Sequence, residues 1–377
     1  MDTSGMQPGR EVPPVVRGLL VVVFLYLFLV GVGFLEAGIA SMGKGFQQGL
    51  LESVSNPISG LCAGILATVL VQSSSVSTST IVGMVGAGTL PLALAVPMIM
   101  GANIGTTVTS TLAALGSIRR AEEFRRAFAA ATVHDFFNLL AVTVLLPLEL
   151  ATGFLSRMAG GLTEILIGAE FNASEPGKSP IRTAVKLPIG WVEGLLEPGG
   201  LASVVFLGVG LGLIFLALGM ITRNMRRLVA GGVERVMNRV IGGGGGAVGI
   251  LVGIGVTVAV QSSSITTSIL VPLVAAGVLT LPSAYPVTLG ANVGTTITAL
   301  LASLAVVRPE GLTIALVHML FNVVALAIVY PVPVVRMVPL RLAEALAGLA
   351  TRRHRVVFAY TVTVFLVLPL LGVFLIQ

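Results

Sequence analysis

The sequence predicts an all-α polytopic membrane protein. The predicted fold has two inverted-topology repeats, each with a re-entrant helical hairpin and a broken helix, plus a C-terminal transmembrane helix. Three observations predict this fold class. The composition is strongly apolar, long uncharged segments recur along the chain, and both halves carry the same polar motifs in the same order.

The composition excludes several broad classes of protein. Of the 377 residues, 55% are hydrophobic and only 10% are charged, and the mean hydropathy is +1.02. Because soluble proteins carry about 25% charged residues, most soluble enzymes are excluded, and so are nucleic-acid binders despite the net charge of +6. The single cysteine, Cys62, cannot form an internal disulfide, and no Cys-x-x-Cys pattern indicates a metal or redox site.

Nine segments of the chain are long and uncharged or nearly so. A helix that crosses a membrane needs about 20 apolar residues. Seven of the segments suit simple crossings, namely residues 18–40, 90–115, 127–150, 201–222, 281–307, 312–334 and 356–376.

The other two segments, residues 56–88 and 246–279, are too long for one helix and too short for two full crossings. Each has a Gln-Ser-Ser-Ser motif at its middle, at residues 72–75 and 261–264. Non-helical backbone at membrane depth is tolerated only where protein or a watery cavity surrounds it. We therefore expect two re-entrant hairpins, each with two half-depth helices that meet at a polar tip.

The two halves are an internal duplication. Residues 72–107 align without gaps on residues 261–296, with 20 identities in 36 positions. Both copies contain Gly-Ala-Asn-x-Gly-Thr-Thr, in which two glycines that flank an asparagine can break a helix. A His-x-x-Phe-Asn motif follows in each half, starting at His134 and at His318. Chance does not produce such a repeat.

The distribution of Lys and Arg predicts the orientation. If each repeat has one helix, a hairpin and two more helices, and the N-terminus is cytoplasmic, 16 of the 22 basic residues lie on the cytoplasmic side. Three crossings is an odd number, so the second repeat is inverted, as is typical of secondary transporters. The predicted parts are a cytoplasmic N-terminal segment (1–17), repeat 1 (18–150), an external connector (151–200), repeat 2 (201–334), a basic cytoplasmic loop (335–355) and the final transmembrane helix (356–377).

The hairpin tips have the chemistry of an oxyanion site. At each tip the second half-helix presents free N–H groups and roughly half a positive charge. Hydroxyl donors beside such a terminus suit a tetrahedral anion, and they come from Ser73, Ser74, Ser75, Ser262, Ser263 and Ser264. Serines in membrane helices also bond to neighbouring helices, but two equivalent copies favour the binding site.

The first half-helix of each hairpin ends in free carbonyl groups, which suit a small cation such as Na⁺. Neutral side-chain oxygens from the repeated motifs complete this prediction. Sodium ligands, or residues that shape the site, are expected to be Gln72, Ser77, Thr78, Asn103, Thr106, Thr107, Gln261, Thr266, Thr267, Asn292, Thr295 and Thr296.

Charge then favours coupled transport. No Lys or Arg lies inside the predicted membrane segments. Two helix N-termini supply about one positive charge, whereas desolvating an unpaired anion costs tens of kcal/mol in the Born limit. A dianion at this site therefore needs cations that travel with it. No organic cofactor is predicted, and the sequence assigns no oligomeric state.

Three further residues are candidates for coupling: His134, Asp135 and His318. A membrane histidine is more often an interhelical hydrogen-bond partner than a ligand. Asp135 is the only carboxylate well inside a helix that follows a hairpin. A functional role and pairing with His134 or nearby Arg side chains are both open for it.

The two Gln-Ser-Ser-Ser motifs, the Gly-Ala-Asn-x-Gly-Thr-Thr pair and the His-x-x-Phe-Asn pair make the sequence resemble the type II sodium-phosphate cotransporter family. The resemblance implies sodium-driven uptake of inorganic phosphate, with both tips lining the substrate and sodium sites. Animal members have a large external loop with disulfides, whereas the connector here is short and has no cysteine. This departure suggests a bacterial relative in the plasma (bacterial inner) membrane.

Three alternatives stay open. The first keeps the fold and changes the cargo to sulfate, arsenate or a dicarboxylate. The second is an anion channel. The third is an intramembrane serine hydrolase that uses Ser, His134 and Asp135, but adjacent side chains on a helix point about 100° apart, so Asp135 is poorly placed to orient His134 as a catalytic triad requires.

Overall fold

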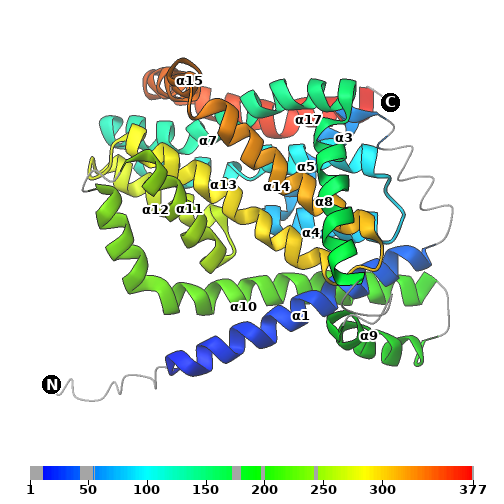
Figure 1. The fold of residues 1–377 in the computed structure, drawn as a ribbon. Helices are drawn as coiled ribbons and strands as arrows, with labels where there is room; N and C mark the ends of the chain where they lie inside the picture. Colours follow the sequence, from blue (N-terminus) through cyan, green and yellow to red (C-terminus); the bar gives the residue numbers. More distant parts are fainter. Residues whose placement is uncertain are drawn as a thin grey trace, which may run out of the picture.

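The computed structural model describes residues 12–42, 54, 56–171, 180–196, 200–241 and 245–375. All regular secondary structure in these ranges is helical. Residues 1–11 of the predicted N-terminal segment lie outside them. The helices pack into one bundle whose two most prominent helices, α1 and α10, lie side by side along one edge (Figure 1).

The helices of the first half and the connector follow the sequence pattern closely. They are α1 (Pro14–Ser41), α3 (Pro57–Val71), α4 (Ser74–Gly86), α5 (Leu92–Gly105), α6 (Val108–Ala114), a 3₁₀ turn (Leu115–Ser117), α7 (Ala121–Thr152), α8 (Phe154–Phe171) and α9 (Pro180–Glu193).

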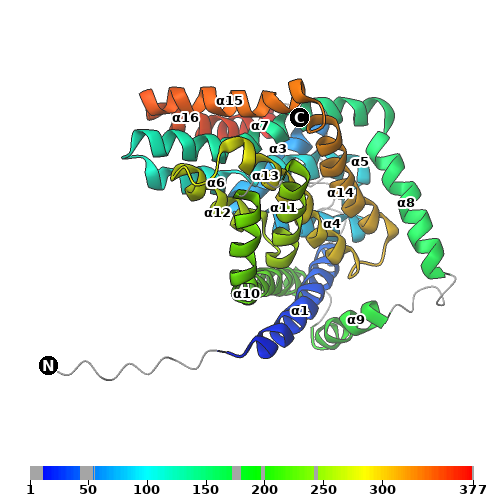
Figure 2. The ribbon, with the colours of Figure 1, turned by 60° about the vertical axis from the view of Figure 1, so that its left-hand side comes forward.

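The second half repeats this order up to α14, except that the single helix α13 stands where the first half has α5 and α6. It consists of α10 (Gly200–Ile241), α11 (Gly246–Val260), α12 (Ser263–Ala275), α13 (Leu281–Ser303), α14 (Pro309–Val329), α15 (Pro333–Arg352), α16 (Arg355–Val362), a π-helical turn (Thr363–Val367) and α17 (Leu368–Leu375). In Figure 2, α15 lies along α7.

Six helical segments are long and apolar enough to cross a membrane. They are Pro14–Ser41, Leu92–Ser117, Ala121–Thr152, Gly200–Leu228, Pro309–Val329 and Arg355–Leu375. They correspond to six of the seven predicted crossings. The seventh, α13, is 23 residues long, but its amide and hydroxyl side chains make it less apolar than the other six.

Glycines bring the helices that carry the two motifs into direct backbone contact. In the first half α3 packs on α5, and a Cβ atom at Gly64 would lie 2.0 Å from the Met98 carbonyl oxygen. In the second half α11 packs on α13, and a Cβ atom at Gly253 would lie 2.1 Å from the Val287 carbonyl oxygen. Only glycine permits this approach, as is common between membrane helices.

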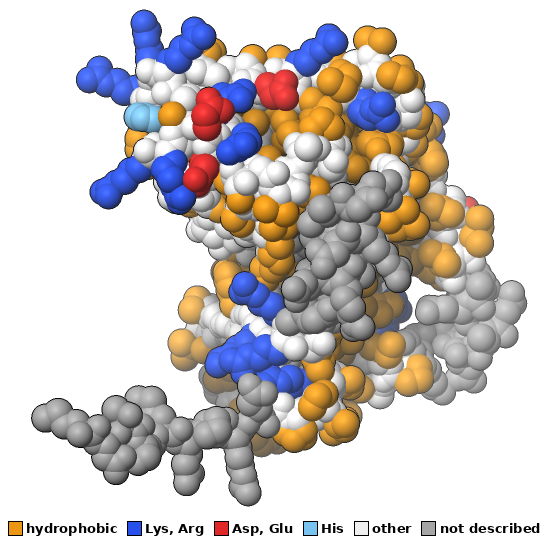
Figure 3. Space-filling view, turned by 90° about the vertical axis from the view of Figure 1, so that its left-hand side faces the viewer, with side chains coloured by type: hydrophobic (Ala, Val, Ile, Leu, Met, Phe, Trp, Pro, Cys, Tyr) orange, Lys and Arg blue, Asp and Glu red, His pale blue; other side chains and the backbone are white. Residues whose placement is uncertain are grey.

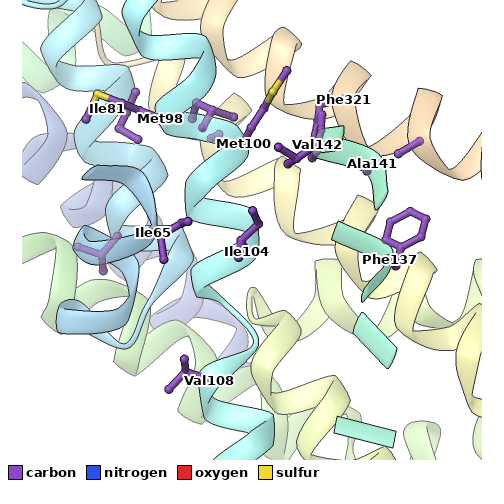
Figure 4. Close-up of a cluster of buried hydrophobic side chains, with 14 of the residues drawn as sticks. Ile65, Ile81, Met98, Met100, Ile104, Val108, Phe137, Ala141, Val142 and Phe321 are labelled. Atoms are coloured by element: carbon purple, nitrogen blue, oxygen red, sulfur yellow. The ribbon is translucent and has the colours of Figure 1, made fainter. Parts of the chain in front are cut away.

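An apolar core surrounds these pairs. Figure 4 shows five members of this core, namely Ile65 of α3, Met100 and Ile104 of α5, Phe137 of α7 and Phe321 of α14. All five side chains are buried. Side chains from both halves therefore share one core, which holds the polar motifs at fixed positions.

Two sequence predictions are wrong. The first is the second broken helix. In the first half α5 ends at Gly105 and α6 starts at Val108, but α13 runs unbroken through the equivalent motif. One difference is Ser110 of α6, whose hydroxyl lies 2.8 Å from the Thr267 hydroxyl in the other half. The equivalent position in α13, Ala299, has no hydroxyl, so it cannot form the corresponding hydrogen bond that would favour a break in α13.

The second wrong prediction is the basic loop at residues 335–355, most of which forms α15. The buried residues Leu340, Ala343, Ala347 and Ala350 recur at helical spacing, and α15 packs on α7. Lys and Arg side chains gather on the face seen in Figure 3. The connector, for its part, contains α8 and α9.

Candidate functional site

The two Gln-Ser-Ser-Ser turns meet. The Ser75 hydroxyl donates to the backbone carbonyl of Gln261, with 3.5 Å between the oxygens. These residues are 186 positions apart in the chain. The structure therefore brings together the two tips that the sequence placed in separate halves.

Each turn has the same backbone geometry. Gln72 and Gln261 both have a φ of 55°, and they are the only described residues other than glycine in the left-handed region. Each glutamine ends one helix, and the next residue begins another as its N-cap. The Ser73 hydroxyl accepts from the Val76 N–H (3.3 Å), and the Ser262 hydroxyl accepts from the Ile265 N–H (3.4 Å).

The glutamine side chains brace the turns from behind. Nε2 of Gln72 donates to the Val69 carbonyl at 2.5 Å, and Nε2 of Gln261 donates to the Val258 carbonyl at 2.7 Å. Their Oε1 atoms accept from threonine hydroxyls, from Thr109 at 3.4 Å and from Thr298 at 3.0 Å. Among the described residues each glutamine oxygen thus accepts one hydrogen bond, which leaves its second lone pair available to a cation.

Sequence reasoning missed Thr109 and Thr298. Both lie 37 residues after the glutamine that they contact. The signal was available, because the two threonines are equivalent positions of the duplication. Their hydroxyls link each turn to the helical segment just beyond the Gly-Ala-Asn-x-Gly-Thr-Thr motif.

Ser74 and Ser263 are the equivalent serines in the first turn of α4 and of α12. Both residues are buried, at 8% and 1% exposure. The Ser263 hydroxyl has no hydrogen-bond partner within the part of the chain that the structure describes, and no hydrogen bond from the Ser74 hydroxyl occurs there. Two hydroxyls are thus available at the helix N-termini where an anion is expected.

The other motif hydroxyls fall into three groups. Thr266 and Thr267 bond to hydroxyls of other helices, Thr257 and Ser110, each at 2.8 Å. The Thr295 hydroxyl is buried without a partner among the described residues, and Ser264 is half-buried. The remaining hydroxyls donate to carbonyls close by in sequence, and they belong to Ser77, Thr78, Thr106, Thr107 and Thr296.

Four buried asparagines form one cluster where the halves meet. Nδ2 of Asn138 donates to the Asn103 backbone carbonyl at 2.9 Å, and Oδ1 of Asn138 accepts from Nδ2 of Asn292 at 2.8 Å. Nδ2 of Asn322 donates to Oδ1 of Asn103 at 3.2 Å. We name Asn103, Asn138, Asn292 and Asn322 the amide cluster.

The amide cluster joins predicted and missed residues. Asn103 and Asn292 were expected at the site, whereas Asn138 and Asn322 end the His-x-x-Phe-Asn motifs and were not assigned to it. Oδ1 of Asn292 and Oδ1 of Asn322 are buried and have no partner in the described structure. Unpartnered amide oxygens are ligands that suit a hard cation.

The three coupling candidates are all buried. Oδ2 of Asp135 accepts from the Tyr360 hydroxyl at 2.8 Å, while its Oδ1 has no partner in the described part of the chain. Nε2 of His134 and Nδ1 of His318 also have none there. No hydrogen bond among the described residues joins His134 or Asp135 to a tip serine, so the triad of a serine hydrolase is not formed.

We expect Tyr360→Phe to lower the free energy of unfolding by about 1–3 kcal/mol, because it leaves a buried carboxyl oxygen without its donor. Thermal unfolding of the purified variant in detergent measures this effect. The matched control is Tyr26→Phe, which removes a hydroxyl that donates to the Ala184 carbonyl at an exposed position. Equal, small losses in both variants would contradict a special role for the bond to Asp135.

The sequence matches a family model described as Na⁺/Pi-cotransporter over residues 27–169 and 213–351. These two blocks contain both turns and the whole amide cluster.

Similar proteins carry related names. Sodium-dependent phosphate transport protein 2A of Rattus norvegicus is 36% identical over 423 residues, covering 92% of this chain and 65% of the relative. Protein 2B of Bos taurus is 34% identical, covering 93% and 64%, and protein 2B of Homo sapiens is 33% identical, covering 94% and 64%. The chain thus spans less than two thirds of the length of these relatives. No solved structure matches it.

Proposed function

The chain belongs to the Na⁺/Pi-cotransporter family, and on that premise we propose that it carries inorganic phosphate across a membrane together with sodium ions. The single observation that carries the proposal is the meeting of the two Gln-Ser-Ser-Ser turns, through Ser75 and the Gln261 carbonyl. The family's relatives are named as sodium-dependent phosphate transport proteins.

Phosphate binds between the two turns in this proposal. The N-termini of α4 and α12 supply free N–H groups, and the Ser74 and Ser263 hydroxyls supply unused donors. The neighbouring serines, namely Ser73, Ser75, Ser262 and Ser264, complete the lining.

Sodium binds at neutral oxygens beside the phosphate. Support comes from the carbonyl ends of α3 and α11, from the Gln72 and Gln261 side chains that brace them, and from the free oxygens of the amide cluster. In the described structure, no Lys or Arg side chain donates to either turn. The positive charge that a dianion needs is therefore assigned to the sodium ions.

We further propose that the helix pairs on either side of Gln72 and Gln261 are re-entrant hairpins in oppositely oriented repeats. The duplicated turn geometry supports this arrangement. Rocking of the hairpin-bearing core against the other helices would alternate access to the site. The proposal places the chain in the plasma membrane with a cytoplasmic N-terminus, and it assigns Asp135, His134 and His318 to coupling.

The test is the flux of labelled phosphate into proteoliposomes that contain the purified chain. We expect uptake with an inward sodium gradient and none when choline replaces sodium. Equal uptake in choline would overturn sodium coupling. Sulfate, arsenate and a dicarboxylate are also added as competitors of labelled phosphate. If one of them inhibits uptake as strongly as unlabelled phosphate does, phosphate is not the preferred cargo.

A further inference from the structure

Helix α9 is not one of the helices that form the site, and it packs beside the C-terminal half of α1 (Figure 1). One of its faces is packed. Val185 and Ile189 are 1% and 7% exposed, and they contact α1 at Gly33, where an added Cβ atom would lie 2.7 Å from the Ile189 side chain. The Tyr26 hydroxyl of α1 donates to the Ala184 carbonyl at 3.0 Å. Helix α9 is therefore fixed to α1.

The opposite face of α9 is apolar and uncovered. Leu187 and Trp191, one helical turn apart, are 69% and 74% exposed, and Leu195 just beyond the helix is 67% exposed. Two residues along a helix correspond to about 200° of rotation, so this face points away from Val185 and Ile189. Exposed apolar surface of this kind marks a partner or a membrane.

The neighbouring surface indicates which partner covers it. Helix α1 is long and apolar enough to span a membrane, and most of its exposed residues are apolar, among them Leu19 (62%) and Val22 (64%). The uncovered face of α9 therefore belongs to a helix that packs on one with the length and composition of a membrane span. Arg182 and Lys186 lie one turn apart and nearer to the packed face of α9 than to this one, and Lys186 lines a cavity together with Glu36 of α1.

We propose that α9 is an interfacial anchor, in which Leu187, Trp191 and Leu195 insert at the boundary between lipid headgroups and acyl chains. Tryptophan favours that boundary because its ring is apolar and its N–H is polar. Because α9 packs on α1 at Gly33, the anchor also holds α1 in position.

The chain itself provides the probe, because Trp191 is its only tryptophan. The full chain is reconstituted in phosphatidylcholine–phosphatidylglycerol vesicles whose lipids carry bromine either near the headgroup or near the end of the acyl chain. We expect strong quenching of Trp191 fluorescence by the shallow bromines, weak quenching by the deep ones, and protection from iodide in the water.

Two outcomes would overturn the proposal. Quenching by iodide without quenching by brominated lipid would place Trp191 in water. Protection from both quenchers would place it against a second copy of the chain. The measurement needs no transport, so it is independent of whether the chain moves phosphate.

A double variant sharpens the test. Leu187→Ser with Leu195→Ser removes the apolar neighbours of Trp191, and we expect quenching by shallow bromines to fall about twofold or more, since interfacial binding scales with buried apolar area. The control is Ile181→Ser, which removes a side chain of the same helix that is 44% exposed and lies on a different face. The control is expected to leave the quenching unchanged, and an equal fall in both would contradict insertion through the Trp191 face.

Discussion

Gly253→Ala is expected to lower the free energy of unfolding by about 2–3 kcal/mol, whereas Gly255→Ala, two residues further along α11, is expected to cause no loss. The added Cβ atom at Gly253 would lie 2.1 Å from the Val287 carbonyl oxygen and 2.8 Å from the Ala291 backbone nitrogen. Backbone atoms cannot rotate away, so α11 and α13 must separate. At Gly255 nothing lies within 4 Å of the added atom, and alanine favours the helix.

Thermal unfolding of the two variants in the same detergent measures the difference. Gly64→Ala repeats the experiment in the first half, where the added atom would lie 2.0 Å from the Met98 carbonyl oxygen. If the Gly253→Ala and Gly255→Ala variants unfold at the same temperature, α11 and α13 are not in close backbone contact at Gly253. Separation of these helices also pulls Gln261 away from Thr298, so transport should fall together with stability.

Ser74→Ala and Ser263→Ala are each expected to weaken phosphate binding about 10- to 100-fold, because a hydrogen bond to a charged group contributes roughly 1.5–3 kcal/mol. Both hydroxyls lie at helix N-termini in the meeting turns, and neither forms a hydrogen bond within the described protein. Their removal leaves no protein group unpaired. Stability should therefore be unchanged while half-saturating phosphate rises.

Sodium-dependent uptake over a range of phosphate concentrations measures this effect, with thermal unfolding of the same preparations as the check on folding. The matched control is Thr143→Ala on an exposed part of α7, which removes a hydroxyl that donates only to its own helix, at the Leu139 carbonyl. If both serine variants keep the wild-type half-saturating phosphate concentration, the two turns do not form the phosphate site. The two serine variants also test the duplication, since removing equivalent serines should weaken phosphate binding to a similar degree.

The amino-acid sequence predicted the local features of the site well. Gln72 and Gln261 interrupt their apolar segments at the positions expected, because polar, hydroxyl-rich residues there cap a new helix more readily than they continue the old one. Most helix ends lie close to the predicted limits of the uncharged segments, since charge and apolar length determine what can cross a membrane.

The contacts between halves could not be predicted in the same way. A single sequence carries no distance between Asn138 and Asn292, which are 154 residues apart and hydrogen-bonded in the amide cluster. The bond from Tyr360 to Asp135 spans 225 positions. The break after Gly105 and its absence in α13 also depend on tertiary partners such as Ser110 and Thr267, and the motif itself is the same in both places.

That last contrast has a consequence for motion. Seven residues that differ only at Ile104 and Val293 are interrupted in one half and continuous in the other. The interrupted and the continuous conformation of this stretch therefore differ little in free energy, and contacts with the surrounding helices decide which of the two is adopted. A molecule in which the two halves exchanged these states would require no new local conformation, since each is already adopted once by nearly the same peptide.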